Sequence, residues 1–161
     1  MNWYDRAADY DRLFAWDPAA ERDFLLGASE RWGLPRPRRS LEPFCGSGRL
    51  LRAMPGDVIG FDLNEHMVRF AARTCRVFRA DAVRFAVREQ SFDLAFCLVD
   101  SFRYLTSEAA ARSHLSAVGR ALRPGAVYVL GFEIDGDAST EEWSRGGIRA
   151  RVGRLGDADQ G

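Results

Sequence analysis

The sequence predicts an α/β protein built on one doubly wound, mostly parallel sheet. Two observations carry this prediction: the composition is that of a globular domain, and short apolar runs alternate with helical periodicity after residue 37. The chain has 161 residues, of which 47% are hydrophobic, and a chain of this length buries about 70% of the surface that its unfolded form exposes. Short apolar runs between helices are typical of βαβ units, in which helices cover both faces of a parallel sheet.

The first 36 residues predict two helices that precede the sheet. Apolar residues recur at helical spacing over residues 3–14 and again over residues 24–32. Asp17-Pro18 separates the two stretches, because Asp is a good N-cap and Pro suits the first turn of a helix. We expect three parts: a helical segment over residues 1–36, an α/β core over residues 37–135, and an amphipathic strand with a loose tail over residues 136–161.

The core then alternates predicted strands with predicted helices. Arg123-Pro124-Gly125 is expected to close the last helix with a cation, a proline and a glycine. A polar loop over Asp135–Glu142, the strand Ile148–Val152 and a small polar tail over Gly156–Gly161 follow. The core strands are expected at Ser40–Pro43, Asp57–Asp62, Cys75–Arg79, Phe92–Val99 and Ala126–Ile134, and its helices near Ser47–Met54, Glu65–Thr74 and Ser107–Leu122.

Charge and cysteine content exclude several classes of function. Lys+Arg and Asp+Glu both number 23, so the positive field that favours nucleic acid or anionic membranes is missing. The start lacks a secretory signal and no run is long enough to span a membrane, which predicts a cytoplasmic protein. Cys45, Cys75 and Cys97 lie too far apart for a metal pair and are expected to be reduced packing residues, with no bound metal. Arg36, Arg38 and Arg39 are interpreted as a solvated loop, with phosphate binding as the less favoured alternative.

Four successive predicted strands end in groups suited to a ligand. Glu42 ends the first and is followed by the turn Gly46-Ser47-Gly48, while Asp62, Asp81-Ala82 and Asp100 follow the next three. In doubly wound sheets the ligand crevice lies at the carboxyl ends of the strands, and glycines there let a ligand approach the backbone. A carboxylate at the end of the second strand can accept hydrogen bonds from two ribose hydroxyls. The Gly-x-Gly turn alone is also compatible with an ordinary strand-to-helix connection.

Taken in order, these motifs resemble those of class I S-adenosylmethionine-dependent methyltransferases. The resemblance covers roughly Tyr4 to Ile134 and implies a Rossmann-like sheet of strand order 3-2-1-4-5, with S-adenosyl-L-methionine as the cofactor. The matching segments are Glu42–Gly48 for the first motif, Gly60–Met67 for the acidic second-strand motif, Ala80–Ala82 for the adenine motif, Ser91–Ala95 for the fourth-strand motif, and Leu122–Ala126 for the helix exit into the fifth strand.

Carried onto this sequence, the resemblance implies a donor site and two candidate catalytic residues. Tyr10 lies in a segment that resembles the lid helix of small-molecule methyltransferases, and its alternative role is packing on the sheet. Asp100 either bounds the methionine pocket, acts as a base, or caps a turn. His114 is expected in a surface helix and His66 at a helix start, neither as a catalytic base. The implied cofactor-binding residues are Glu42, Phe44, Gly46, Ser47, Gly48, Asp62, Leu63, Asp81, Ala82 and Leu98.

The same residues weigh against other functions. A dinucleotide-binding oxidoreductase needs a third glycine where Leu51 stands, and Glu42 would repel a pyrophosphate but suits a cationic methyl donor. Methyltransferases that act on nucleic-acid bases carry an [Asp/Asn]-Pro-Pro-aromatic motif where this chain has Asp100-Ser101-Phe102. We therefore expect methyl transfer to a small-molecule acceptor by in-line displacement, with a non-catalytic donor-binding domain as the alternative.

Two departures from the family pattern lead to further expectations. Phe44 stands where the family often has glycine, so the turn there either uses an ordinary backbone conformation or is strained. The two strands that usually follow the fifth are apparently missing, which leaves the apolar run Ala126–Ile134 at a sheet edge. The expectation is that Ile148–Val152 covers this edge, that a second copy of the chain does so, or that these residues are the N-terminal part of a longer methyltransferase.

Overall fold

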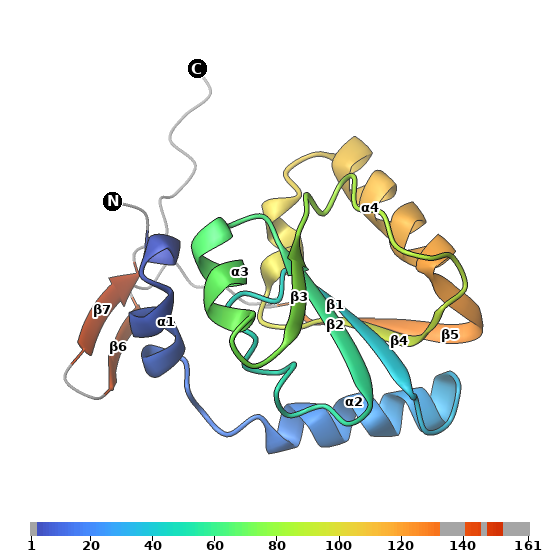
Figure 1. Ribbon diagram of the computed structural model, residues 1–161, viewed down its shortest axis with the longest axis horizontal. Helices are drawn as coiled ribbons and strands as arrows, with labels where there is room; N and C mark the ends of the chain where they lie inside the picture. Colours follow the sequence, from blue (N-terminus) through green and yellow to red (C-terminus); the bar gives the residue numbers. More distant parts are fainter. Residues whose placement is uncertain (1–2, 133–140, 146–147, 153–161) are drawn as a thin grey trace.

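A five-stranded parallel sheet forms the centre of the protein (Figure 1). The computed structural model describes residues 3–132, 141–145 and 148–152. The strand order is β3-β2-β1-β4-β5 and all four pairings are parallel, so the expected fold class and strand order are confirmed. The strands are β1 (Arg39–Pro43), β2 (Asp57–Asp62), β3 (Arg76–Arg79), β4 (Phe92–Cys97) and β5 (Leu122–Leu130).

Helices precede and connect these strands much as the sequence predicts. Asn64 begins α3 by accepting hydrogen bonds from the backbone N–H groups of His66 and Met67, and Ser107 begins α4 by accepting one from Ala110. The elements outside the sheet are η1 (Trp3–Asp5), α1 (Ala7–Leu13), α2 (Ala19–Trp32), α3 (Glu65–Ala71), η2 (Ser101–Tyr104) and α4 (Glu108–Ala121).

Helices α2 and α4 lie on opposite sides of the sheet (Figure 1). Leu25 of α2 belongs to an apolar cluster that includes Leu94 and Phe96 of β4. Val118 of α4 belongs to a second cluster that includes Ala95 of the same strand. Successive side chains of a strand point to opposite faces, so β4 supplies both layers of the core.

The expected helix over Ser47–Met54 is wrong. The chain forms consecutive turns there, in which isolated hydrogen bonds such as that from the Arg52 N–H to the Gly48 carbonyl (3.1 Å) replace a regular ladder. Gly48 adopts a positive φ of 81°, and Pro55 follows the segment directly. Too few residues therefore lie between these two breaks for a helix to nucleate and propagate.

The expected start of the fifth strand at Ala126 is also wrong. Helix α4 ends at Ala121, and β5 begins at Leu122, which pairs with Phe92 of β4. The next pair joins Val127 to Leu94, so four residues of β5 face one residue of β4 in a bulge. Arg123-Pro124-Gly125 lies in this bulge, within the strand rather than before it.

The C-terminal strand does not cover the edge of β5. Strands β6 (Glu141–Arg145) and β7 (Ile148–Val152) form a separate antiparallel pair beside α1, on the far side of the molecule from β5 (Figure 1). Gly146-Gly147 separates them in the sequence, and such a dipeptide favours a tight hairpin over a long-range pairing. The expected loop over Asp135–Glu142 overlaps the first two residues of β6. Its remaining residues and the expected tail Gly156–Gly161 lie outside the described residues.

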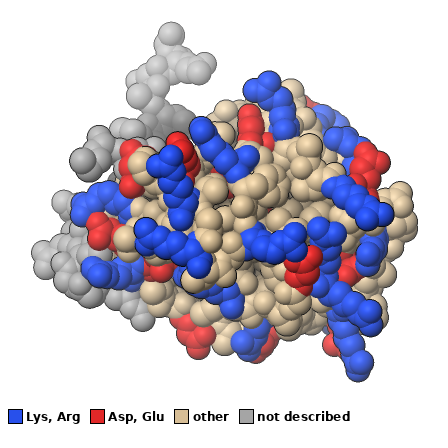
Figure 2. Space-filling view, in the orientation of Figure 1, with Lys and Arg blue, Asp and Glu red and all other residues tan. Residues whose placement is uncertain are grey.

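Arginine and acidic side chains are interspersed over the face shown in Figure 2, in keeping with the net charge of zero. None of the helices in the described part of the chain has the length and apolar character needed to cross a membrane.

Candidate functional site

A cavity of about 180 Å³ lies at the carboxyl ends of β1, β2 and β3, and we call it the strand-end cavity. Parallel strands end at the same edge of the sheet, and residues far apart in the sequence meet there. Tyr104, which the sequence places in the wall of the crevice after the fourth strand, also lines the cavity. Leu105 and Thr106 line it as well, and sequence reasoning missed them. Of the predicted cofactor residues, the cavity is lined by Phe44, Asp62, Leu63, Asp81 and Ala82.

Asp62 joins the end of β2 to the glycine turn after β1. One carboxylate oxygen accepts a hydrogen bond from the Gly46 N–H and the other from the Asn64 N–H, both at 2.9 Å. Burial raises the pKa of Asp62, and these backbone hydrogen bonds act against that rise. Each carboxylate oxygen has a second acceptor position, so Asp62 can hold the turn and still accept hydrogen bonds from a ligand.

The turn from Phe44 to Gly48 is held in a backbone conformation that is unusual for L residues. Phe44 has a φ of 57°, so the strained alternative applies at this position. Gly46 has a φ of 53°, and a Cβ atom added there would meet nothing within 4 Å. Gly48 has a φ of 81°, but its added Cβ would lie 3.2 Å from both Ala71 and Cys75. Gly46 therefore leaves room for a ligand, whereas Gly48 permits close packing against α3.

Glu42 is a buried carboxyl group next to the last residue of β1. Burial raises its pKa well above the usual value, while the nearby Arg49 guanidinium and a hydrogen bond from the Leu51 N–H act in the opposite direction. Its Oε2 atom has no hydrogen-bond partner. An unpartnered acceptor at a buried site costs free energy unless a ligand satisfies it. Glu42 therefore fits a cationic group bound beside the glycine turn.

Arginines that follow the turn attach it to the N-terminal segment. Arg52 donates one hydrogen bond to the Ser47 carbonyl (2.9 Å) and another to Asp11 of α1 (2.6 Å). Arg49 forms a two-fold ion pair with Glu21 of α2, with both N–O distances at 2.6 Å. The Arg49 guanidinium also lies over the Trp16 ring, 4.2 Å from its centre. Both helices before the sheet are therefore tied to the turn.

Aromatic residues also connect the N-terminal segment to the lining of the strand-end cavity. Tyr10 stacks between Phe14 and Tyr4, with ring centres 4.4 and 5.7 Å away. The hydroxyl group of Tyr4 is hydrogen-bonded to that of Tyr104, which lines the strand-end cavity. Burial raises the pKa of Tyr10 to about 12, so its phenol is neutral at physiological pH. Tyr10 itself lies behind Tyr4 rather than among the residues that line the cavity.

The segment after β4 is strained beside the cavity. Val99 and Asp100 both have a φ of 60°, which is costly for a β-branched residue such as valine. Asp100 accepts a hydrogen bond from Arg103 at 2.8 Å, so its negative charge is compensated locally. Leu98 packs at the margin of the apolar cluster around Leu25. Neither Leu98 nor Asp100 lines the strand-end cavity.

His114 is buried in the core, so its expected position on the protein surface is wrong. Its Nδ1 lies 2.9 Å from the Ala82 carbonyl oxygen and its Nε2 lies 2.8 Å from the Tyr128 hydroxyl. The carbonyl can only accept, so Nδ1 carries the proton and Nε2 accepts from Tyr128. The signal in the sequence is its spacing, three and four residues before the buried Ala117 and Val118. His114 thereby fixes the backbone of a predicted adenine-binding residue.

Comparison with known proteins identifies the family to which this chain belongs. Residues 41–125 match the family model of the methyltransferase domain, which is more than half of the chain. The chain therefore belongs to the methyltransferase domain family, and its sheet is that of the class I enzymes. The resemblance drawn from the sequence motifs is confirmed. A comparison with curated protein sequences finds no match.

Several solved structures share the fold. The sugar N-methyltransferase KedS8 from Streptoalloteichus is 26% identical, with 83% of this chain and 58% of that one covered and a TM-score of 0.70. CalS10 from Micromonospora echinaspora, an amino pentose methyltransferase solved with SAM bound, is 25% identical, with 97% and 66% covered and a TM-score of 0.63. DesVI from Streptomyces venezuelae is 19% identical, with 93% and 68% covered and a TM-score of 0.68. The chain spans less than two thirds of the length of KedS8 and CalS10.

Proposed function

We propose that this protein binds S-adenosylmethionine at the carboxyl ends of β1–β3 and transfers its methyl group to a small-molecule amine. The observation that carries the proposal is the buried Glu42 carboxylate, whose unpartnered oxygen lies beside a glycine turn that leaves space at Gly46. A methyl donor with an ammonium and a sulfonium group supplies the positive charge that such a site lacks. A pyrophosphate brings no positive charge with which Glu42 could pair, which disfavours the dinucleotide alternative.

Each predicted cofactor residue has a role in this proposal. Glu42 would accept hydrogen bonds from the donor's ammonium group, and Asp62 from its ribose hydroxyls. Asp81 and Ala82 would meet the adenine edge, with Phe44 and Leu63 along the same cavity. Gly46, Ser47 and Gly48 would form the turn, and Leu98 would lie behind the reacting end.

Once bound, the donor supplies an activated methyl group on a sulfonium leaving group. The chain's part is then to orient the acceptor and exclude water. Tyr10 stays a neutral phenol, so we propose that it stabilises the N-terminal lid and donates a hydrogen bond rather than acting as a base. Asp100, whose charge Arg103 compensates, is proposed to orient the amine by accepting a hydrogen bond from it.

The proposed acceptor class is an amino sugar. Support comes from KedS8, named a sugar N-methyltransferase, and from CalS10, named an amino pentose methyltransferase. A neutral amine needs no covalent catalysis, which agrees with a site whose ionisable groups are mostly acids. We also propose a cytoplasmic location, in agreement with the unpaired state of Cys45, Cys75 and Cys97, and association of two copies through the edge of β5.

Calorimetry with S-adenosylmethionine, its demethylated product and NAD tests the donor assignment. We expect binding of the first two and none of NAD, and the reverse result would overturn the proposal. Transfer of a labelled methyl group to amino sugars, with the corresponding hydroxyl sugars as controls, tests the acceptor class. Donor binding without transfer to any acceptor would instead support the non-catalytic alternative.

A further inference from the structure

A second hollow, of about 370 Å³, lies at the opposite end of the sheet from the strand-end cavity. Its floor is apolar and comes from the sheet and from the connection before β4. Three arginines, Arg39, Arg76 and Arg88, surround that floor. We call this feature the arginine hollow. Its floor residues are Ile59, Val77, Phe78, Val87 and Phe92.

In the part of the chain that the structure describes, no helix residue lines the hollow. The connection between β3 and β4, residues 80–91, runs as turns and extended chain. Val87 and Arg88 of this connection form one wall, while Val77 and Phe78 of the edge strand β3 stay half-buried. A doubly wound sheet ordinarily buries such residues under a crossover helix. Their partial exposure leaves a concave apolar surface with a volume within the range of small-molecule sites.

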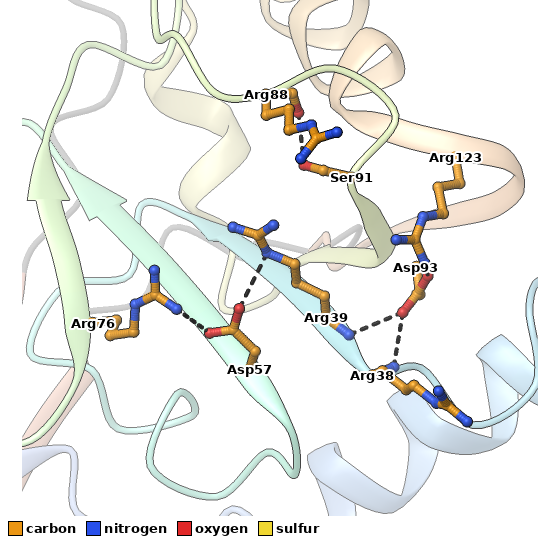
Figure 3. Close-up of polar contacts among 8 residues, drawn as sticks. All are labelled: Arg38, Arg39, Asp57, Arg76, Arg88, Ser91, Asp93 and Arg123. Atoms are coloured by element: carbon orange, nitrogen blue, oxygen red, sulfur yellow. Dashed lines mark hydrogen bonds and ion pairs between the residues drawn. The ribbon is translucent and has the colours of Figure 1, made fainter.

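The arginines around the hollow outnumber the carboxylates available to them. Asp57 pairs with the Arg39 Nε atom at 3.2 Å and with the Arg76 Nη1 atom at 2.5 Å. Among the described residues, Arg88 has no carboxylate partner for its guanidinium group. Figure 3 shows the terminal nitrogens of Arg39 directed away from Asp57, toward the side on which Arg88 lies. Three positive groups thus share one negative charge.

The other acid drawn in Figure 3 is already fully engaged. Asp93 accepts hydrogen bonds from the backbone N–H groups of Arg38 and Arg39, each at 2.9 Å. Its second carboxylate oxygen pairs with Arg123 at 2.5 Å. Burial would raise the pKa of Asp93, but these partners outweigh burial and lower it. Asp93 therefore secures the start of β1 and leaves the excess positive charge of the hollow uncompensated.

We propose that the arginine hollow binds a phosphate-bearing small molecule with a flat or apolar body, such as a nucleoside diphosphate. Guanidinium groups hold phosphate oxygens through pairs of parallel hydrogen bonds, and Arg88 and the outer nitrogens of Arg39 are available to do so. The Arg39 guanidinium lies over the buried Phe92 ring, 4.9 Å from its centre. The half-buried Val77, Phe78 and Val87 are the apolar residues left for the body of a ligand. The apolar floor binds the body of the ligand and the arginine rim binds its charge.

This site is separate from the proposed methyl-donor site, although the Phe78 ring of its floor lies 5.4 Å from the Phe61 ring that lines the strand-end cavity. Arg39 begins β1 and Pro43 ends it, and five residues of strand separate the two ends by about 13 Å. No residue lines both the arginine hollow and the strand-end cavity. Anion binding here can therefore be measured whether or not the protein transfers methyl groups.

Calorimetry with three probes tests the inference. Inorganic pyrophosphate carries the charge alone, uridine carries the ring alone, and uridine diphosphate carries both. A uridine compound is chosen because an adenine compound would compete for the proposed donor site. We expect uridine diphosphate to bind more tightly than pyrophosphate, uridine to bind weakly or not at all, and the affinity to fall as salt increases. Saturation with S-adenosylhomocysteine should leave this binding unchanged.

Two arginine variants make the result specific. Arg88→Gln should weaken the binding of pyrophosphate and of uridine diphosphate by about tenfold or more, since a charge-assisted contact is lost. Arg112→Gln, which removes an exposed arginine paired with Glu108 on α4, is the matched control and should bind like the parent protein. Absence of pyrophosphate binding, or equal losses in the two variants, would overturn the inference. Displacement of uridine diphosphate by S-adenosylhomocysteine would also overturn it.

Discussion

Replacement of Glu42 by glutamine tests the central charge of the proposed donor site. The carboxyl group is buried, and one of its oxygens has no hydrogen-bond partner. Glu42→Gln keeps the size of the side chain but removes its negative charge and half of its acceptor capacity. If Glu42 binds the donor's ammonium group, this variant should lose donor affinity while the sheet stays intact.

The magnitude follows from the kind of contact that is lost. A hydrogen bond between charged groups contributes about 1.5–3 kcal/mol, which corresponds to a dissociation constant about 10- to 150-fold higher. Screening by solvent does not reduce this value greatly, because Glu42 is buried.

The pH dependence gives a second signature. Burial raises the pKa of Glu42, so the folded protein retains this proton at pH values where the unfolded chain has lost it. The contribution of Glu42 to the unfolding free energy is therefore present below the usual pKa and is lost as pH rises through the raised one. A cationic donor binds the charged carboxylate, so binding should release a proton and affinity should rise with pH over the same window. Glu42→Gln should abolish this proton release.

Calorimetry in two buffers of different ionisation enthalpy measures affinity and proton release together. Glu108→Gln changes an exposed glutamate on α4 by the same charge and is the control. An unchanged dissociation constant in Glu42→Gln, with proton release preserved, would refute the assignment of Glu42 to the donor's ammonium group.

Four further substitutions separate donor binding from folding. Asp62→Ala should raise the dissociation constant of S-adenosylhomocysteine about 10- to 150-fold in calorimetry, because hydrogen bonds to a charged group are lost; an unchanged value would limit Asp62 to holding the turn. Gly48→Val should lower the unfolding free energy in urea by about 1–3 kcal/mol, since its Cβ would crowd α3 at a positive φ. Gly46→Ala should chiefly weaken donor binding, because a Cβ atom there meets nothing within the protein. Equal losses of stability in the two variants would contradict this distinction. Arg52→Gln breaks a partly exposed ion pair and should speed S-adenosylhomocysteine dissociation about two- to fivefold in stopped-flow fluorescence; an unchanged rate would exclude Arg52 from holding the lid.

The parallel sheet and the groups at its strand ends could be predicted from the sequence because both depend on local pattern. The strand Asp57–Asp62 has the bounds that its apolar run predicts, and Asp62 lies at its end beside the glycine turn. Alternation of short apolar runs with helices identifies a parallel sheet, and in such a sheet the carboxyl ends of the strands meet at one edge. The family motifs added the donor class and the order of the strands.

Features that depend on long-range contacts could be seen only in the tertiary structure. His114 has the spacing of a surface helix residue as well as of a core one, and its burial is decided by Ala82 and Tyr128, which the sequence does not bring near it. The sequence leaves open whether the backbone at Phe44 is ordinary or strained. The tertiary structure decides this, because φ there depends on the hydrogen bond that the next residue, Cys45, donates to the Phe61 carbonyl.

The arginines give the clearest contrast between the two levels. In the sequence, Arg39 belongs to a basic loop and is interpreted as solvated, while Arg76 and Arg88 stand alone in different segments. Parallel pairing of β1 with β2 and of β2 with β3 brings the starts of these strands together, and the connection before β4 folds back over them. Local sequence determines which residue types stand at each strand end, but only the packed sheet determines which of them share a surface. Charge excess at a site is a property of that shared surface, and the net charge of zero conceals it.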